Sequence, residues 1–427
     1  MIESMNKETD TENVLRQLHG GEIYDKKVEH DFSVNLNPLG MPEKLKEVLR
    51  KAVDDASCYP DYECASLRKH LAGYFGVTPS QVICTAGASE ALTAILGCMP
   101  ERPALIPVPS FYGYERAAVA AGMDVTYYDM GKLKAGQVAD FSLNEDIFDV
   151  IPEKGVVILG NPNNPTGAVT ERKLLMDILS ECEKKETYLV MDESFSDFVR
   201  GTGLRSASVG AEQTSTGRFA PPDARSEAES VTSPVGEVLK SLKAGTGSPD
   251  ARSGAGDEIS LAGEIRDHEY LLIIKSFTKT YAAPGVRLGC ILVSDENLAD
   301  RIRQRLPEWN ISSFAMAAGM LWGTDEKYIA DMRSMVADER KILCRAFENM
   351  GFEVIKGEAN FILIRSGIEM YEPLLKKGFL IRDCRNMRGL KEGYYRVAVK
   401  KHEENVGLIN ALCIITGKDP SSLRSSG

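Results

Sequence analysis

Short apolar runs that end in polar residues recur along this chain of 427 residues. Three of them occupy residues 81–84, 156–159 and 188–191, and small or polar residues follow each run at once. Runs of this length, with amphipathic helical stretches between them, are typical of the buried strands of an α/β protein. Because ligands bind at the carboxyl ends of strands in open α/β sheets, the residues after each run are the first candidates for a site.

These following residues differ in what they can bind. Residues 160–167 read Gly-Asn-Pro-Asn-Asn-Pro-Thr-Gly, a tight loop whose side-chain amides can face a ligand. Asp192 is an acid at a strand tip, and residues 85–90 lead from a strand into a helix-like stretch. Such a strand–turn–helix passage offers backbone N–H groups to a phosphate. Each feature alone is also typical of an ordinary turn, a helix cap or a helix start, so their order along the chain carries the prediction.

A fourth feature is Lys279, which ends the run Ser-Phe-Thr-Lys eight residues before the glycine-flanked Arg287. A lysine in such a turn suits a Schiff-base lysine beside a phosphate clamp. Pyridoxal phosphate carries an aldehyde and a phosphate on one ring, and proteins hold it through a lysine and a partner for its pyridinium nitrogen. A solvated loop lysine is the alternative, and the other three features favour the cofactor.

On these motifs the chain resembles the fold-type I pyridoxal-phosphate enzymes of the class I/II aminotransferase superfamily. The resemblance implies that Lys279 carries the cofactor, that Asp192 keeps its pyridine nitrogen protonated and that Asn164 bonds its 3-hydroxyl group. It also implies a ring that stacks on the cofactor, four residues around its phosphate and a tyrosine that reaches this phosphate from a second subunit. The stacking ring is Phe111, and the tyrosine from the second subunit is Tyr59. The residues around the phosphate are Ala88, Ser89, Ser276 and Arg287.

Two families of this superfamily share further motifs with the chain. The start His19-Gly20-Gly21 and residues 31–40, 380–384 and 389–399 resemble the threonine-phosphate decarboxylases of cobalamin assembly. Tyr-Pro-Asp at residues 59–61, the loop 160–167 and Ala-Asn-Phe at 359–361 are shared with histidinol-phosphate aminotransferases. The His-Gly-Gly start favours the decarboxylase, as does Phe195, where the aminotransferases usually carry a tyrosine. Phe195 as an ordinary core residue is the alternative.

The function expected from this resemblance is a lyase that converts O-phospho-L-threonine, or the serine analogue, into a phosphorylated amino alcohol and CO₂. The alternative is a histidinol-phosphate aminotransferase. A third hypothesis is a cofactor-binding regulator without catalysis, and the intact Lys279, Asp192 and Arg287 argue against it.

Both catalytic alternatives imply a phosphorylated substrate. Arg382 and His19 are the predicted donors to its phosphate, with help from residues 33–37, of which Asn37 is the predicted contact. Arg396 resembles the arginine that pairs with the substrate carboxylate. A surface ion pair for Arg382 and an ordinary loop histidine for His19 are the alternatives.

Composition narrows the class of protein. A net charge of −11 argues against a nucleic-acid binder, which needs a basic face. Nine cysteines without a Cys-x-x-Cys pair match no metal site and fit reduced thiols in the cytoplasm. No run of eighteen apolar residues or secretion leader is present, so we expect no membrane span.

The pattern of runs predicts an α/β architecture in two domains, and the resemblance implies that it is of fold type I. Residues 1–41 are expected to form an N-terminal arm of the small domain, 42–306 the large cofactor domain with a mostly parallel sheet, and 307–427 the smaller α+β domain. Residues 201–264 are poor in apolar side chains and predict a mostly mobile surface insertion, with one short helix at 237–243. A partner-docking or regulatory loop is the alternative. The substrate is expected between the domains, at the boundary of a homodimer.

Overall fold

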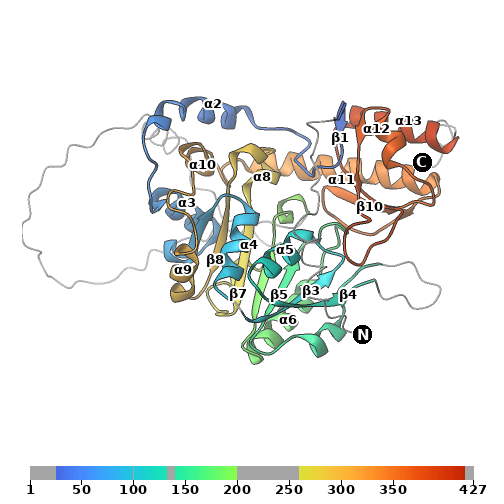
Figure 1. The fold of residues 1–427 in the computed structure, drawn as a ribbon. Coiled ribbons are helices and arrows are strands. Elements are labelled where there is room, and N and C mark those ends of the chain that lie inside the picture. Colours follow the sequence, from blue (N-terminus) through green and yellow to red (C-terminus); the bar gives the residue numbers. More distant parts are fainter. Residues whose placement is uncertain (1–25, 100, 132–139, 200–258, 419–427) are drawn as a thin grey trace, which may run out of the picture.

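The computed structural model describes residues 26–99, 101–131, 140–199 and 259–418, and a seven-stranded sheet forms the centre of its larger part (Figure 1). The strand order is β2–β8–β7–β6–β5–β3–β4. All neighbours run parallel except the two pairs that β8 makes. The strands are β2 (Val82–Thr85), β3 (Pro103–Val108), β4 (Asp124–Asp129), β5 (Val156–Gly160), β6 (Tyr188–Asp192), β7 (Leu271–Ser276) and β8 (Gly289–Val293). The predicted α/β fold with a mostly parallel sheet is confirmed.

Both faces of this sheet are buried under helices. Along β7, Leu271 and Ile273 pack into one core, and Leu272 and Ile274 pack into another, because successive side chains of a strand point to opposite faces. The first core also contains residues of α3 (Ala65–Phe75), α6 (Arg172–Lys184) and α10 (Ser313–Gly319). The second contains residues of α4 (Ala88–Gly97), α5 (Tyr112–Ala120) and α9 (Glu296–Arg303).

A smaller part is built on a four-stranded antiparallel sheet in the order β12–β13–β10–β9. Its strands are β9 (Glu353–Val354), β10 (Phe361–Arg365), β12 (Arg382–Asp383) and β13 (Tyr394–Ala398), and its helices are α11 (Glu326–Asn349), α12 (Tyr371–Leu375) and α13 (His402–Thr416). The strand β1 (His30–Asp31) pairs with β11 (Phe379–Leu380), which joins the described N-terminal segment to this part. The long helix α11 connects the two parts in Figure 1.

The segment before α11 packs with the large sheet. Ala315, Ala318 and Trp322 lie in its first core. We therefore propose that the small domain begins near α11 rather than at residue 307. Short elements complete the structure: α2 (Glu43–Lys51), α8 (Phe277–Thr280), η1 (Asp54–Ser57), η2 (Pro79–Gln81), η3 (Glu145–Val150), η4 (Ser196–Phe198), η5 (Ala262–Glu264) and η6 (Pro284–Val286).

The predicted insertion extends too far at its C-terminal end. Ile259, Leu261 and Ala262 are buried, and the backbone N–H of Leu261 donates to Oε1 of Glu193 at 2.8 Å. Residues 259–264 are therefore packed structure, and the prediction of mobile chain was wrong for them. A few apolar residues at the C-terminal end of a long polar segment were enough to anchor that end. The rest of the predicted insertion, including the helix at 237–243, lies outside the described residues.

Candidate active site

The polar residues after the parallel strands meet at one edge of the large sheet. Gly160 of β5 is the register partner of Asp192 of β6, and β7 ends beside them at Ser276. A cavity of about 280 Å³ opens at this edge and reaches the smaller part. Ten residues singled out from the sequence line it: Ala88, Ser89, Phe111, Asn164, Asp192, Ser276, Lys279, Arg287, Arg382 and Arg396.

Lys279 lies in α8, the short helix that follows β7 directly. Its backbone carbonyl accepts a hydrogen bond from the N–H of Asn37 at 3.1 Å, which fixes the turn that carries it. Burial, with the charges of Arg396 and Arg287 nearby, lowers the pKa of the Lys279 ammonium to about 8. A lysine with such a pKa has a substantial neutral fraction near neutral pH, which is the form that reacts with a carbonyl group.

Asp192 is held by three donors. Its Oδ1 accepts bonds from the backbone N–H of Ser194 at 3.0 Å and from the Ser194 hydroxyl at 2.5 Å, and its Oδ2 accepts one from the Tyr114 hydroxyl at 2.9 Å. Burial raises the pKa of Asp192 above its ordinary value, although the bonds from Ser194 and Tyr114 lower it. The carboxylate is thus fixed in one orientation at the cavity wall.

An anion cradle lies where α4 begins. Gly87, with a φ of +92°, turns the chain so that Ala88 starts the helix. A Cβ atom added at Gly87 would lie 2.9 Å from Nη2 of Arg287. That nitrogen donates to the carbonyl of Ala86 at 3.0 Å. The hydroxyls of Ser276 and Thr278 lie 3.0 Å apart on the same cavity. Helix N–H groups, hydroxyls and a guanidinium are the donors that a phosphate group needs.

Arg396 is fixed at the cavity wall by polar contacts to two segments. It donates to the amide oxygen of Asn164 at 2.5 Å and to the backbone carbonyl of Ser33 at 2.7 Å. Its side chain is buried, and burial lowers its pKa to about 10, so it stays charged at neutral pH. Within the described part of the chain, its Nε has no hydrogen-bond partner, and neither has Oδ1 of Asn35, another cavity residue.

Arg382 and Arg396 are register partners on β12 and β13. Paired residues of antiparallel strands point to the same face of a sheet, so two guanidinium groups reach the cavity from one side. Arg382 also donates to the amide oxygen of Asn386 at 3.0 Å. The smaller part of the fold thus contributes two cations, and the larger part contributes Lys279 and Arg287.

Two predicted residues, Asn37 and Tyr59, do not line the cavity of this chain. The Asn37 amide donates to the carbonyl of Thr280 at 2.8 Å, so Asn37 shapes the lysine turn, while Asn35 is the residue that lines the cavity. Tyr59 is 81% exposed and packs on Trp309, with 4.7 Å between ring centroids. His19 lies outside the described residues.

The sequence interpretation missed Tyr114 and Asn35. Tyr114 follows the predicted Phe111 by three residues at the start of α5, the helical spacing that places two side chains on one face. That spacing was the available signal for Tyr114. For Asn35, the unpaired buried oxygen is visible only in the folded structure.

The comparison with sequence families decides the assignment. The model of the family described as aminotransferase class I and II matches residues 28–412. The chain belongs to this family. Its relatives include a threonine-phosphate decarboxylase of Salmonella typhimurium, 28% identical over 92% of both chains. Another is histidinol-phosphate aminotransferase 2 of Archaeoglobus fulgidus, 27% identical over 91% of this chain and 93% of the relative.

Solved structures agree with this assignment to the class I and II aminotransferases. The histidinol-phosphate aminotransferase from Clostridium acetobutylicum superposes with a TM-score of 0.70 at 26% identity, over 90% of this chain and 98% of its own. The Sinorhizobium meliloti histidinol-phosphate aminotransferase, solved in complex with pyridoxal 5'-phosphate, has a TM-score of 0.67 at 16% identity, over 92% of both chains. The predicted superfamily and its cofactor, pyridoxal phosphate, are confirmed.

The cavity of this member of the class I and II aminotransferase family fits that cofactor. The glycine cradle leaves room for an anion beside Arg287, where a Cβ at Gly87 would intrude. Lys279 and Asp192 face the same cavity from neighbouring strand ends. Three classes of group are therefore present in one enclosed space: a lysine amine, a carboxylate and a set of phosphate donors. In the part of the chain that the structure describes, no group of three or more His, Cys, Asp or Glu residues suits a metal ion.

Proposed function

We propose that the protein is a pyridoxal-phosphate-dependent decarboxylase of O-phospho-L-threonine, or of O-phospho-L-serine, in the assembly of the cobamide side chain. The observation that carries this proposal is the pairing of Arg382 with Arg396 on one side of the cavity. A phosphorylated amino acid has two anionic groups, a carboxylate and a phosphate monoester, and two guanidinium groups can bind one each.

The cofactor contacts follow from the cavity. Lys279 is the residue that would hold the cofactor covalently, and Asp192 would pair with its protonated ring nitrogen. Asn164 would contact its ring hydroxyl, and Phe111 would cover a ring face. Its phosphate would lie among Ala88, Ser89, Ser276 and Arg287. When bound, pyridoxal phosphate supplies a ring that accepts the electron pair left when a bond to Cα breaks.

The choice between decarboxylation and transamination depends on how the substrate is held. The bond of Cα that stands perpendicular to the ring plane is the one that breaks. Arg396, fixed by Asn164 and Ser33, would hold the carboxylate, and Arg382 would hold the phosphate. In decarboxylation, CO₂ leaves and Cα needs a proton. Lys279 is the one lysine among the described residues that line the cavity, so its amine is the group to deliver that proton.

Phe195 supports the lyase over the transaminase. It lies on the cavity and packs edge-on against Phe361, with 5.0 Å between ring centroids. A phenylalanine offers no hydroxyl to the ring oxygen at the place where the resembling aminotransferases usually carry a tyrosine. Histidinol-phosphate aminotransferase remains the second candidate because relatives of that name match at similar identity.

One pair of assays separates these functions. The purified protein receives O-phosphothreonine without an oxo acid, and CO₂ is followed. Separately it receives histidinol phosphate with 2-oxoglutarate, and glutamate is followed. CO₂ in the first assay alone supports the decarboxylase, and glutamate in the second supports the transaminase. Activity in neither assay would overturn both and favour a cofactor-binding regulator.

We further propose a cytoplasmic homodimer in which Tyr59 reaches the cofactor phosphate of the partner. The exposed ring of Tyr59, with Tyr62 and Trp309 beside it, forms an aromatic patch that a second copy would cover. The nine cysteines are free thiols, as in reducing compartments. None of the helices in the described ranges has the length and apolar character needed to cross a membrane. Sedimentation of the purified protein tests the dimer.

A further inference from the structure

Glu193 and Lys275 are the immediate chain neighbours of two cavity residues, Asp192 and Ser276. Because side chains alternate across a strand, Asp192 and Ser276 face the cavity, and Glu193 and Lys275 face the opposite side of the sheet. The tips of β6 and β7 are adjacent here, since the N–H of Glu193 donates to the carbonyl of Ile274 at 2.9 Å. A contact between the side chains of Glu193 and Lys275 therefore links the ends of β6 and β7, which carry the site.

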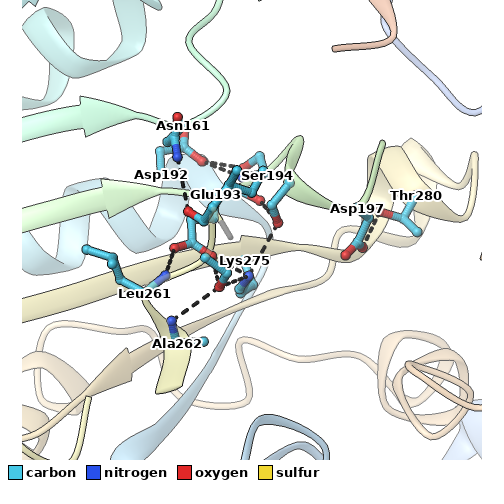
Figure 2. A network of polar contacts seen from close by, with 12 residues as sticks. Asn161, Asp192, Glu193, Ser194, Asp197, Leu261, Ala262, Lys275 and Thr280 are labelled. Atoms are coloured by element: carbon cyan, nitrogen blue, oxygen red, sulfur yellow. Dashed lines mark hydrogen bonds and ion pairs between the residues drawn. The ribbon is translucent and has the colours of Figure 1, made fainter. Parts of the chain in front are cut away.

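The two side chains form a buried ion pair between Lys275 Nζ and Glu193 Oε2 (Figure 2). The Glu193 side chain is fully buried and that of Lys275 is 6% exposed. The Ser260 hydroxyl donates to Glu193 Oε2 at 2.6 Å, and the N–H of Leu261 donates to Oε1 at 2.8 Å. Lys275 Nζ also lies 3.3 Å from the hydroxyls of Ser260 and Ser196. Both carboxylate oxygens are thus satisfied.

Net stability does not by itself explain why a buried ion pair is present at this position. Removing two charges from water costs about as much as their attraction returns, so buried ion pairs are weak evidence for stability and are best attested as devices that specify one arrangement. The pair does not line the cavity and cannot touch a substrate there. It does hold two strand tips and the segment with Ser260 in a single geometry.

We propose that Glu193 and Lys275 are positioning residues for the cofactor. Acting from the far face of the sheet, their ion pair fixes the tip of β6 against the tip of β7 and α8, and so fixes Asp192 relative to Lys279. This inference rests on the cofactor and is independent of which substrate the enzyme uses. Failure of the CO₂ assay would therefore leave it intact, and its own failure would leave the proposed decarboxylation intact.

The charge of Lys275 matters as well as its position. Burial and the negative charge of Glu193 both raise the pKa of Asp192, burial being the larger cause. Lys275 offsets that charge at the carboxylate itself. Lys275→Met would leave Glu193 with its bonds from Ser260 and Leu261 but without its cation, which would weaken the ionised form of Asp192 that the ring nitrogen needs.

The test uses the cofactor-loaded full chain and two readouts that do not depend on turnover: the visible absorption band of the bound cofactor and the dissociation constant of pyridoxal phosphate. We expect Lys275→Met to shift the band and to raise the dissociation constant about tenfold, the scale of a lost outer contact. Ser260→Ala should change both in the same direction by about threefold or less. Lys275→Arg keeps the charge and should recover much of the loss.

Glu339→Gln is the matched control, since Glu339 is also a nearly buried carboxylate but pairs with His402 and Asn405 in the smaller part of the fold. It should leave both readouts unchanged. A merely structural role would lower the melting temperature and leave the band of the folded protein as in the wild type. A folded Lys275→Met protein with wild-type band and dissociation constant overturns the proposal. If Lys275→Met does not fold, unchanged readouts in Ser260→Ala and in Glu193→Gln/Lys275→Met overturn it equally.

Discussion

The hydroxyl of Tyr114 donates a 2.9 Å hydrogen bond to Oδ2 of Asp192, with both side chains buried at the start of α5 and the end of β6. This bond is one of the contacts that lower the pKa of Asp192 against the burial that raises it. It therefore favours the ionised carboxylate, which is the form that can pair with a protonated ring nitrogen.

Tyr114→Phe should weaken catalysis through Asp192. Loss of the donor raises the pKa of Asp192 further, so kcat/KM should fall about tenfold, as for a lost bond to a charged group. Steady-state kinetics and the visible band of the bound cofactor measure the effect. Tyr128→Phe is the control, because the Tyr128 hydroxyl bonds Asp146 and Tyr128 does not line the cavity. Equal kinetics for the two variants would contradict the prediction.

Gly87→Ala should damage the anion cradle. The residue has a φ of +92°, and its new Cβ would lie 2.9 Å from Nη2 of Arg287, so both backbone strain and displacement of Arg287 are expected. We expect the affinity for pyridoxal phosphate to fall about tenfold or more, as strain of this kind costs 1–3 kcal/mol. Gly97→Ala in the same helix meets no atom within 4 Å and should bind the cofactor normally.

Cofactor uptake should depend on the protonation of Lys279. The lysine must be neutral to react with an aldehyde, and burial lowers its pKa to about 8. In cofactor-free protein, the rate of uptake should therefore rise with pH up to about 8 and level off above it. Stopped-flow absorbance measures this rate, and Lys279→Ala should show no covalent uptake and no turnover. A rate that still rises about tenfold per pH unit near pH 9 would mean an ordinary lysine pKa.

Arg382→Ala should impair phosphorylated substrates selectively. We expect KM for O-phosphothreonine to rise about tenfold or more, since a charge-assisted bidentate contact is lost, with little change for an unphosphorylated amino acid. His19→Ala should act in the same direction. Arg385→Ala provides the control, because this half-exposed arginine pairs with Asp383 and Glu392 instead. Equal losses on both kinds of substrate would remove the phosphate-pocket hypothesis.

Arg388 anchors the segment that follows Arg382 and the strand β12. Its guanidinium donates to Oε1 of the buried Glu115 in α5 at 2.8 Å and lies 4.2 Å from the ring centroid of Tyr127. Arg388→Ala should leave Glu115 buried without its cation, so the melting temperature should fall by several degrees and KM for O-phosphothreonine should rise about threefold. Calorimetry and kinetics check both effects. Arg388→Lys should recover part of the melting temperature and part of KM. An Arg388→Ala protein with wild-type KM would show that Arg382 keeps its place without this anchor.

The limits of sequence interpretation are clearest after Asp192. The acid at the strand tip was recognisable because its neighbours in the chain form an apolar run. Its donor Tyr114 lies 78 residues earlier, and nothing in the sequence around Asp192 points to it. The low apolar content of residues 201–264 predicted one mobile segment. However, Leu261 and Ala262 are buried, and Ser260 bonds Glu193 from 67 residues away. A window average cannot detect a contact made by a single hydroxyl.

The chain by itself determined the α/β class, the cofactor and the residues Lys279, Asp192, Asn164 and Arg287 as candidates. Lys279, Asp192 and Asn164 lie at the end of a strand or a few residues after it, and Arg287 follows Lys279 by eight residues. Such patterns are local. Tertiary structure decided which polar groups meet: Arg396 with Asn164 and Ser33, Tyr114 with Asp192, and Lys275 with Glu193 and Ser260. These contacts join segments far apart in the chain, because burial forces each charged or polar group to find a partner wherever the packed strands place one.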